Sequence, residues 1–277
     1  MKKIWIVLLP LLLALLLTAC GTEPEIPPPT EGDSFTETAL LSEELYGVTL
    51  IGIEPDGLMG YTLELRLENR SQADCSFSLD GMAVNGLQVT AFMRVPVSAG
   101  LSVIQEVSIV EKLDTLGIST PTDLQLALRV SNADSTAALT QKVAHYYPLG
   151  ESRAEVFVRE TRESDTVLVD NEQLTVIVTG YREDRIFGYT AELYLVNKTD
   201  TDVIFQIGEA AVNGHAIDPY YATLVMAGAA FFDEVSWNTV DMEAAGITDV
   251  EELAFSLEAK AFPGDTVYLE KDVTLQP

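Results

Sequence analysis

Residues 60–69, GYTLELRLEN, and residues 188–197, GYTAELYLVN, decide the fold of this chain. In each stretch apolar side chains alternate with polar ones, so one face of the segment is apolar and the other is polar. A single offset of 128 residues separates the two stretches. The period of two indicates a β-strand with one face covered by a core, and the repetition indicates that the chain contains this strand twice.

The same offset aligns the two halves of the chain well beyond these strands. Matched positions include Gly52 with Gly180, Asp56 with Asp184, Phe77 with Phe205, Ala83-Val84-Asn85-Gly86 with Ala211-Val212-Asn213-Gly214, and, after one inserted residue, Gly117-Ile118 with Gly246-Ile247. Self-similarity at a fixed offset is the signature of a repeated structural unit. We therefore predict two domains, at residues 38–150 and 165–277, in which the second duplicates the first and residues 151–164 connect them.

Turn signals separate short alternating runs in both copies. Asn85-Gly86 and Asn213-Gly214 suit the two positive-φ positions of a type I′ turn, so each predicts a hairpin. Residues 111–116 and 241–245 have the pattern of single helical turns that a following glycine ends. Alternation at residues 154–159 predicts a strand in the connector, which either closes the first sheet or bridges the two domains. About seven short strands per copy predict an all-β fold of two tandem immunoglobulin-like antiparallel β-sandwich domains.

The first twenty residues have the pattern of a secretory signal. Two lysines precede an apolar run from Ile4 to Leu17, which is too short for a comfortable membrane span. Leu17-Thr18-Ala19-Cys20 then resembles the lipobox of bacterial lipoproteins. The resemblance implies that a signal peptide at residues 1–19 is removed and that Cys20 receives a diacylglyceryl group. The protein would then be anchored in the membrane at the cell surface, on the extracytoplasmic side.

The only other cysteine, Cys75, has no cysteine partner once Cys20 is lipidated. Its matched position in the second copy is Val203. A position that accepts valine is typical of the core, so we predict that Cys75 is a small buried hydrophobe rather than a redox or metal group.

Residues 20–37 and the net charge of the chain indicate how the folded domains would lie with respect to the membrane. The segment is rich in proline and glutamate, which predicts an extended spacer. The chain has 16 Lys and Arg against 43 Asp and Glu, and without the two signal-peptide lysines 14 face 43, a formal charge of −29. Such a field repels nucleic acid and anionic headgroups and favours basic partners, or it simply keeps a surface protein soluble. We expect membrane attachment through the lipid and no nucleic-acid partner.

Several short features of the two copies carry a resemblance. They are the strand that ends in Asn69 or Asn197, the Val-Asn-Gly turn, the Ala-Gly before a strand, and the Gly-Ile before the late strand. Together they resemble uncharacterised immunoglobulin-like domains of Firmicutes surface lipoproteins. The resemblance implies the fold and the surface location, and it supplies no catalytic residues.

The sequence contains no pattern of a known catalytic or zinc centre. His145 and His215 are the only histidines, and neither lies near a cysteine or the other histidine. Glu64 and Glu192 are a matched pair on the expected outer strand face, which favours solvated side chains, although abundant carboxylates leave a glycosidase-like acid–base pair open. We predict no catalytic residues, no metal site and no cofactor.

Two loops of the second copy are weak ligand candidates. Asp200 and Asp202 could offer oxygen atoms to calcium, but the spacing is not that of an EF-hand and turn chemistry explains the same residues. Tyr220 and Tyr221 could form an aromatic recognition loop for a sugar or a peptide. The first copy has Phe92-Met93 there, and apolar residues in both copies favour packing instead.

The favoured function is therefore a non-catalytic, membrane-anchored surface lipoprotein that serves as a binding or structural module for a protein or glycan partner. One alternative is an enzyme that acts on envelope or host glycans through unpaired carboxylates. Another is a solute-binding lipoprotein of a transporter, which the near absence of long helical patterns disfavours.

Overall fold

The computed structural model describes residues 35–184 and 188–277. The predicted signal peptide at residues 1–19, Cys20 and most of the spacer lie outside the described residues. Strands dominate this part of the chain, with one short α-helix, α2 (Thr239–Ala244), and one 3₁₀ turn, η1 (Glu151–Arg153). None of the helices in the described ranges is long and apolar enough to cross a membrane.

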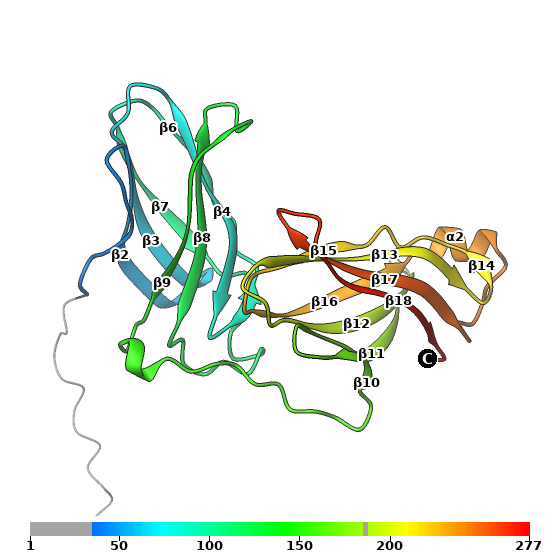
Figure 1. Cartoon of the computed structure of the whole chain (residues 1–277). Coiled ribbons are helices and arrows are strands. Elements are labelled where there is room, and N and C mark those ends of the chain that lie inside the picture. Colours follow the sequence, from blue (N-terminus) through cyan, green and yellow to red (C-terminus); the bar gives the residue numbers. More distant parts are fainter. Residues whose placement is uncertain (1–34, 185–187) are drawn as a thin grey trace, which may run out of the picture. The chain divides into compact units, whose positions relative to one another are not determined.

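The first copy folds into two antiparallel sheets (Figure 1). The first sheet has the order β1 (Thr38–Ser42), β2 (Tyr46–Gly57), β3 (Gly60–Asn69), β7 (Ser102–Ser108). In the second sheet, β4 (Cys75–Val84) pairs with β8 (Leu124–Asn132), which pairs with β9 (Ala138–Tyr146), while β5 (Leu87–Val89) and β6 (Arg94–Val97) pair with the other edge of β4.

The second copy repeats this pairing strand for strand. Its first set of strands has the order β10 (Thr166–Asp170), β11 (Leu174–Asp184), β12 (Gly188–Asn197), β16 (Ala230–Trp237). Its second set has the order β13 (Asp202–Val212), β17 (Leu253–Phe262), β18 (Val267–Leu275), with β14 (His215–Ala216) and β15 (Ala222–Val225) on β13. The prediction of an all-β protein with antiparallel sheets that resemble immunoglobulin-like sandwiches is confirmed.

The alternation of apolar and polar residues on β3 places the core. On β3, Leu63, Leu65 and Leu67 are fully buried and belong to one apolar cluster with Phe77 of β4 and Leu126 of β8. Since these strands come from both sheets, the cluster fills the space between them. Each such side chain contributes about 1.5–3 kcal/mol when it is removed from water.

The outer face of the central strands is less exposed than alternation alone suggests. Thr62 and Thr190 are buried, and each shares a hydroxyl–hydroxyl hydrogen bond with the neighbouring strand, to Ser108 at 2.8 Å and to Ser236 at 2.7 Å. The pairing satisfies the polar atoms where water is excluded.

The predicted type I′ hairpins are confirmed in both copies. Asn85 and Gly86 have φ of 51° and 76°, and Asn213 and Gly214 have φ of 49° and 78°. Positive φ at both central positions gives the turn the twist of the strands that it joins.

The predicted helical turns form unequally. Residues Thr239–Ala244 form α2, and Asn238 caps it by accepting a hydrogen bond from the Asp241 amide. The matching residues before Gly117 form hydrogen-bonded turns without a helix. Both following glycines have positive φ, 84° at Gly117 and 72° at Gly246, which ends each segment as predicted.

The prediction of a strand at residues 154–159 is wrong. The segment is extended, but its amides bond to loops and turns instead of a strand edge: the Glu155 amide donates to Thr122 Oγ1 at 2.9 Å and the Phe157 amide to the Asn85 carbonyl at 2.7 Å. The Phe157 ring packs on the first core and meets Phe232 of β16 edge-on at 6.0 Å. The connector thus bridges the two copies.

A buried ion pair stabilises the C-terminal end of the connector. Both terminal guanidinium nitrogens of Arg159 donate to Asp165, at 2.7 and 2.6 Å, and these side chains are 8% and 1% exposed. The Arg159 hydrogen bond lowers the pKa of Asp165 to about 2. Arg159 also lies over the Tyr194 ring, 5.5 Å from its centroid.

The two copies also touch through their backbones. The Ala230 amide of β16 donates to the Gly86 carbonyl at 2.8 Å, so β16 and β5 join edge to edge. The Gln88 amide group donates to the Leu224 carbonyl and accepts from the Met226 amide, each at 2.9 Å. Residues Glu37–Pro277 accordingly form one compact unit.

Cys75 is buried in the first core, as predicted. Burial, together with nearby Asp74, raises the pKa of its thiol to about 11. A thiol that keeps its proton at neutral pH is a poor nucleophile and a poor metal ligand, which agrees with a packing role.

We expect the second copy, residues 165–277, to unfold cooperatively when isolated, because it has its own core of fully buried residues such as Trp237 and Phe205. Its melting temperature should lie at least about 5 °C below that of the same residues in the full chain, since the contacts of Tyr194, Met226 and Ala230 with the first copy are lost. Calorimetry of both proteins measures the difference. A broad, non-cooperative transition would show that the copies are a single intertwined domain.

Candidate functional site

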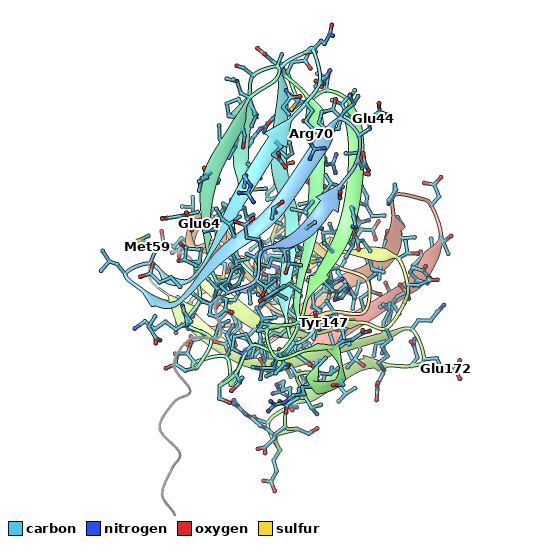
Figure 2. All side chains as sticks on the ribbon, turned by 90° about the vertical axis from the view of Figure 1, so that its left-hand side faces the viewer. Glu44, Met59, Glu64, Arg70, Tyr147 and Glu172 are labelled. Carbon is cyan, nitrogen blue, oxygen red and sulfur yellow. The ribbon has the colours of Figure 1, made fainter. Side chains whose placement is uncertain are left out.

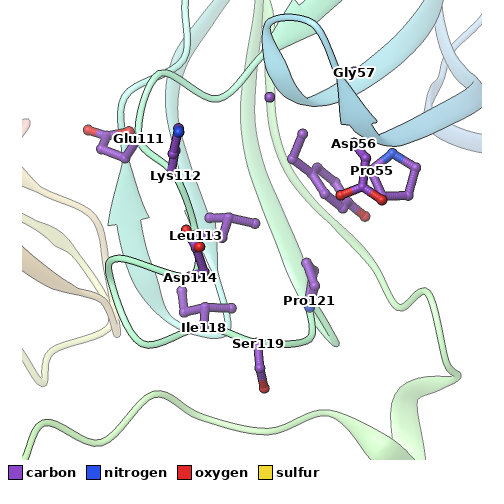
Figure 3. Close-up of a pocket in the computed structure, with 12 residues that line it drawn as sticks. Pro55, Asp56, Gly57, Glu111, Lys112, Leu113, Asp114, Ile118, Ser119 and Pro121 are labelled. Atoms are coloured by element: carbon purple, nitrogen blue, oxygen red, sulfur yellow. The ribbon is translucent and has the colours of Figure 1, made fainter.

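The same corner of each copy is hollowed. In the first copy a cavity of about 440 Å³ lies between the β2–β3 hairpin and the loop that follows β7 (Figure 3). Asp56 lines it from the hairpin, and Leu113, Asp114 and Ile118 line it from the loop. Tyr61 at the start of β3 also contributes to the wall.

The second copy has a cavity of about 930 Å³ at the corresponding place. Tyr189 replaces Tyr61, and, after the inserted residue, Met242, Glu243 and Ile247 replace the three loop residues of the first copy. We call the two cavities the end pockets. They are equivalent in position and in the kind of side chains that line them.

The fold positions these pockets through turns that only particular residues can form. Gly188, with φ of 94°, lies so close to β16 that an added Cβ would be 2.0 Å from the Trp237 carbonyl oxygen, and Gly60 repeats the conformation with φ of 90°. A backbone hydrogen bond closes the turn in each loop. The Ile118 amide donates to the Leu113 carbonyl at 2.8 Å, and the Ile247 amide donates to the Met242 carbonyl at 2.9 Å. These bonds hold an apolar residue at both ends of each turn, beside the cavity.

Burial raises the pKa of both pocket tyrosines. It raises the pKa of Tyr61 to about 12, with a smaller contribution from Tyr146. It raises the pKa of Tyr189 as well, assisted by Tyr181 and Glu183. Both phenols therefore remain hydrogen-bond donors over the physiological range.

Carboxylates give each pocket an acidic rim. The first pocket has Asp56, Glu111 and Asp114 against one cation, Lys112. Glu111 is partly used by the fold, because it accepts hydrogen bonds from the Thr90 amide at 2.8 Å and the Thr90 hydroxyl at 2.5 Å.

The second pocket is more acidic than the first. It is lined by Glu183, Glu243 and Asp249 and by no cation in the part of the chain that the structure describes. An apolar floor with an acidic rim suits a ligand group that is cationic or rich in hydroxyls and carries an apolar body.

The predicted aspartate loop has a structural role. Asp202 accepts a hydrogen bond from the Ala227 amide at 2.8 Å, and its counterpart Asp74 accepts one from the Ala99 amide at 2.9 Å. Asp200 is exposed beside this turn. Within residues 35–184 and 188–277, no three His, Cys, Asp or Glu side chains gather as a metal site would need.

The two tyrosines of the predicted recognition loop differ in their exposure to solvent. Tyr221 is partly buried against the second core and donates its hydroxyl to Asp233 at 2.9 Å, and burial with this carboxylate raises its pKa. Tyr220 is 86% exposed, so the prediction that it packs is wrong. Its φ of 52° and the hydrogen bond from its amide to Asp218 turn the chain and direct the ring outward.

The remaining candidates lie away from the end pockets. Figure 2 shows Glu64 on the sheet face turned away from the core, where it is in register with Glu106, as Glu192 is with Glu234. His145 is exposed, and its Nδ1 lies 2.9 Å from Asp123.

His215 is also exposed, on β14, as predicted for a residue after the turn. Sequence reasoning missed the end pockets, although the matched Gly117-Ile118 and Gly246-Ile247 pairs were their signal.

Comparisons with known proteins identify no family. No family model and no curated protein matches the chain. Among solved structures, CBD12 from CALX1.2 is 12% identical, with 74% of this chain and 76% of that chain covered and a TM-score of 0.22. Red sea bream transglutaminase is 12% identical with a TM-score of 0.24, and 85% of this chain covers 31% of that one. A protein of unknown function from Porphyromonas gingivalis W83 is 10% identical, with 78% of this chain and 91% of that chain covered and a TM-score of 0.21. Likenesses at these scores carry no functional argument.

We expect Tyr61 to make the stability depend on pH in the alkaline range. Its pKa is about 12 in the folded protein and near 10 when unfolded. Between these values the folded protein keeps the proton that the unfolded chain loses, so the stabilisation is complete below about pH 10 and declines as the pH rises towards 12. Urea unfolding across this range should show a steeper decline for the native protein than for Tyr61→Phe. Equal slopes would contradict the assignment.

Proposed function

We propose that the protein is an extracytoplasmic lipoprotein, anchored through a diacylglyceryl group on Cys20, whose two tandem immunoglobulin-like domains at residues 38–150 and 165–277 bind a protein or glycan partner without chemical conversion. The observation that carries the proposal is the pair of end pockets. The same kind of cavity, with a tyrosine, apolar loop residues and acidic side chains, occurs at the same place in both copies.

Two equivalent pockets on one chain favour a partner with repeated features. When one pocket is occupied, the other meets its ligand group at a high effective concentration, and the combined affinity exceeds that of either pocket. Glycan polymers and repetitive surface proteins both offer such repeats. The difference at Lys112, whose counterpart Asp241 does not line the second pocket, means that the two pockets need not bind with equal strength.

Some carboxylates outside the end pockets have structural roles. The pKa values of Asp134, Asp165, Asp170 and Glu258 are all lowered, mainly by hydrogen bonds to neighbouring hydroxyl or cationic side chains. These carboxylates brace turns and ion pairs.

In this proposal the lipid anchor attaches the protein to the membrane, and the acidic folded body recognises the partner. Two acyl chains hold a protein at a bilayer without help from its surface. A body with a formal charge of −29, derived above for the chain without its signal peptide, is repelled by anionic headgroups. The proline-rich spacer would keep the body away from them and present the end pockets to a partner in the envelope.

Replacing Cys20 with serine should abolish the anchor. We expect Cys20→Ser protein to remain unprocessed or to be released, because only the cysteine thiol accepts the diacylglyceryl group. Detergent partitioning of the cell fractions measures the change. Retention of the variant in the detergent phase at the native level would disprove the lipoprotein assignment.

Charge reversal in the pockets should weaken binding to isolated cell envelopes. We expect Asp114→Lys and Glu243→Lys each to lower the affinity by about tenfold, and the double variant by more than either one, because both pockets contribute to one attachment. Sedimentation of the labelled, lipid-free chain with envelopes measures the bound fraction.

Glu172→Lys is the matched control, since it changes the charge by the same amount on an exposed turn (Glu172 is labelled in Figure 2) that lines neither pocket. If this control weakened binding as much as the pocket variants do, attraction of the whole acidic body to the envelope would explain the result, and the pockets would not be the site.

A further inference from the structure

The outer face of the first copy also carries a hollow. It has a volume of about 310 Å³ and is lined by Ser78 and Asp80 of β4, Arg94 of β6, and Arg129 of β8. This face lies on the second sheet, away from the first core. The hollow shares no lining residue with the end pockets, while Met93 and Leu79 of its lining also pack in the first core.

The strand register explains why two arginines meet there. Ser78 of β4 is paired with Arg94 on one side and with Arg129 on the other. Neighbouring strands are about 4.8 Å apart, so the two arginines flank the serine at about 10 Å from each other, measured between backbones. Asp80 lies at the bulge that interrupts the pairing of β4 with β8, which brings its carboxylate beside Arg129.

The two arginines have different partners. Arg129 is paired with Asp80, with Nε and Nη2 at 2.7 and 2.6 Å from the same carboxylate oxygen. The side chain of Arg94 is exposed, and it makes no hydrogen bond or ion pair with any described residue. Counting these three side chains, the hollow has one excess positive charge in a chain where acidic residues outnumber basic ones by 43 to 16.

The three corresponding positions in the second copy carry no arginine. The matched positions there are Ala222, Gln206 and Glu258, and the carboxylate of Glu258 accepts hydrogen bonds from Gln206 and Lys260. The repeat therefore does not require arginines at these positions for folding. The ion pair with Asp80 accounts for Arg129, whereas the side chain of Arg94 has no such partner among the described residues.

An exposed aromatic residue lies next to the lining of the hollow in the chain. Phe92 is 76% exposed and lies two residues before Arg94, with buried Met93 between them. Met93 and Arg94 both line the hollow, and Phe92 and Arg94 are both exposed to solvent. An aromatic face beside an unpaired guanidinium offers an apolar platform and a bidentate donor for a planar oxyanion within one small area.

We propose that this hollow binds a sugar that carries a carboxylate. Arg94 binds the carboxylate through paired N–H donors, and the Phe92 ring packs against the apolar face of the sugar ring. Ser78 and the Asp80–Arg129 pair provide donors and acceptors for the sugar hydroxyls. At physiological ionic strength the charges beyond about 8 Å are screened, so the lining residues and not the acidic body set the preference of the site.

Titration calorimetry of the full-length lipidated protein in detergent tests the proposal. The probe is a hexamer of galacturonic acid, and a glucose hexamer without carboxylates is its neutral counterpart. We expect the acidic hexamer to bind with a dissociation constant of about 1 mM or below, and the neutral one at least about tenfold more weakly. Arg94→Gln and Phe92→Ala should each weaken binding of the acidic hexamer by about tenfold, whereas Phe92→Tyr should keep the native affinity.

Tyr220→Ala is the matched control, because Tyr220 occupies the position of Phe92 in the second copy beside alanine and glutamate rather than arginines. It should leave the binding unchanged. The hollow shares no lining residue with either end pocket, so failure of the end pockets and failure of this site are distinguishable. Equal binding of the neutral hexamer, tighter binding of an oligoglutamate peptide, or no heat with the acidic hexamer would each overturn the proposal. Unchanged thermal melting of the variants confirms that they fold.

Discussion

A buried asparagine at the end of each central strand is the interaction on which both copies depend. Asn69 ends β3, and its amide nitrogen donates to the Ala73 carbonyl at 2.8 Å and to the Val97 carbonyl of the facing sheet at 2.9 Å. Its oxygen accepts from the amide and the hydroxyl of Ser71, at 3.0 and 2.7 Å. Asn197 makes the same bonds with Thr201, Val225 and Thr199. A fully satisfied polar group in a low-dielectric core tolerates one arrangement of its partners, so it fixes how the two sheets meet.

The rest of the architecture follows from that constraint. Once the end of β3 is tied to the opposite sheet, the strand register places its leucines inward, since a slip of one residue would move all of them to the solvent side. The same register puts Tyr61 and Tyr189 at the opposite end of their strands, where the end pockets form. It also decides what lies on the outer faces. There the copies diverge, and the first one gains Arg94 and Arg129 beside a serine.

Prediction from the sequence succeeded where a signal is local and failed where the answer depends on distant groups. Asn85-Gly86 favours positive φ through the properties of its own two residues, and Cys75 follows the period of its strand, so both were predictable. The alternation at residues 154–159 looks like a strand, but a strand also needs an edge to pair with. The amides of Glu155 and Phe157 find a loop and a turn instead. Tyr220 is exposed because of its backbone conformation, which composition does not reveal.

The sequence by itself determined the repeat, the alternation of the strands, the positions of the turns and the acidic charge, because each depends on residues that are close in the chain. The lipobox resemblance belongs to the same class, as a short contiguous pattern. Only the tertiary structure decided which loops enclose a pocket, that Arg94 and Arg129 flank one serine, and that Gln88 holds the second copy through the Leu224 and Met226 backbone. These arrangements depend on strand register and on the contact between the copies, which bring together residues separated by tens to more than a hundred positions.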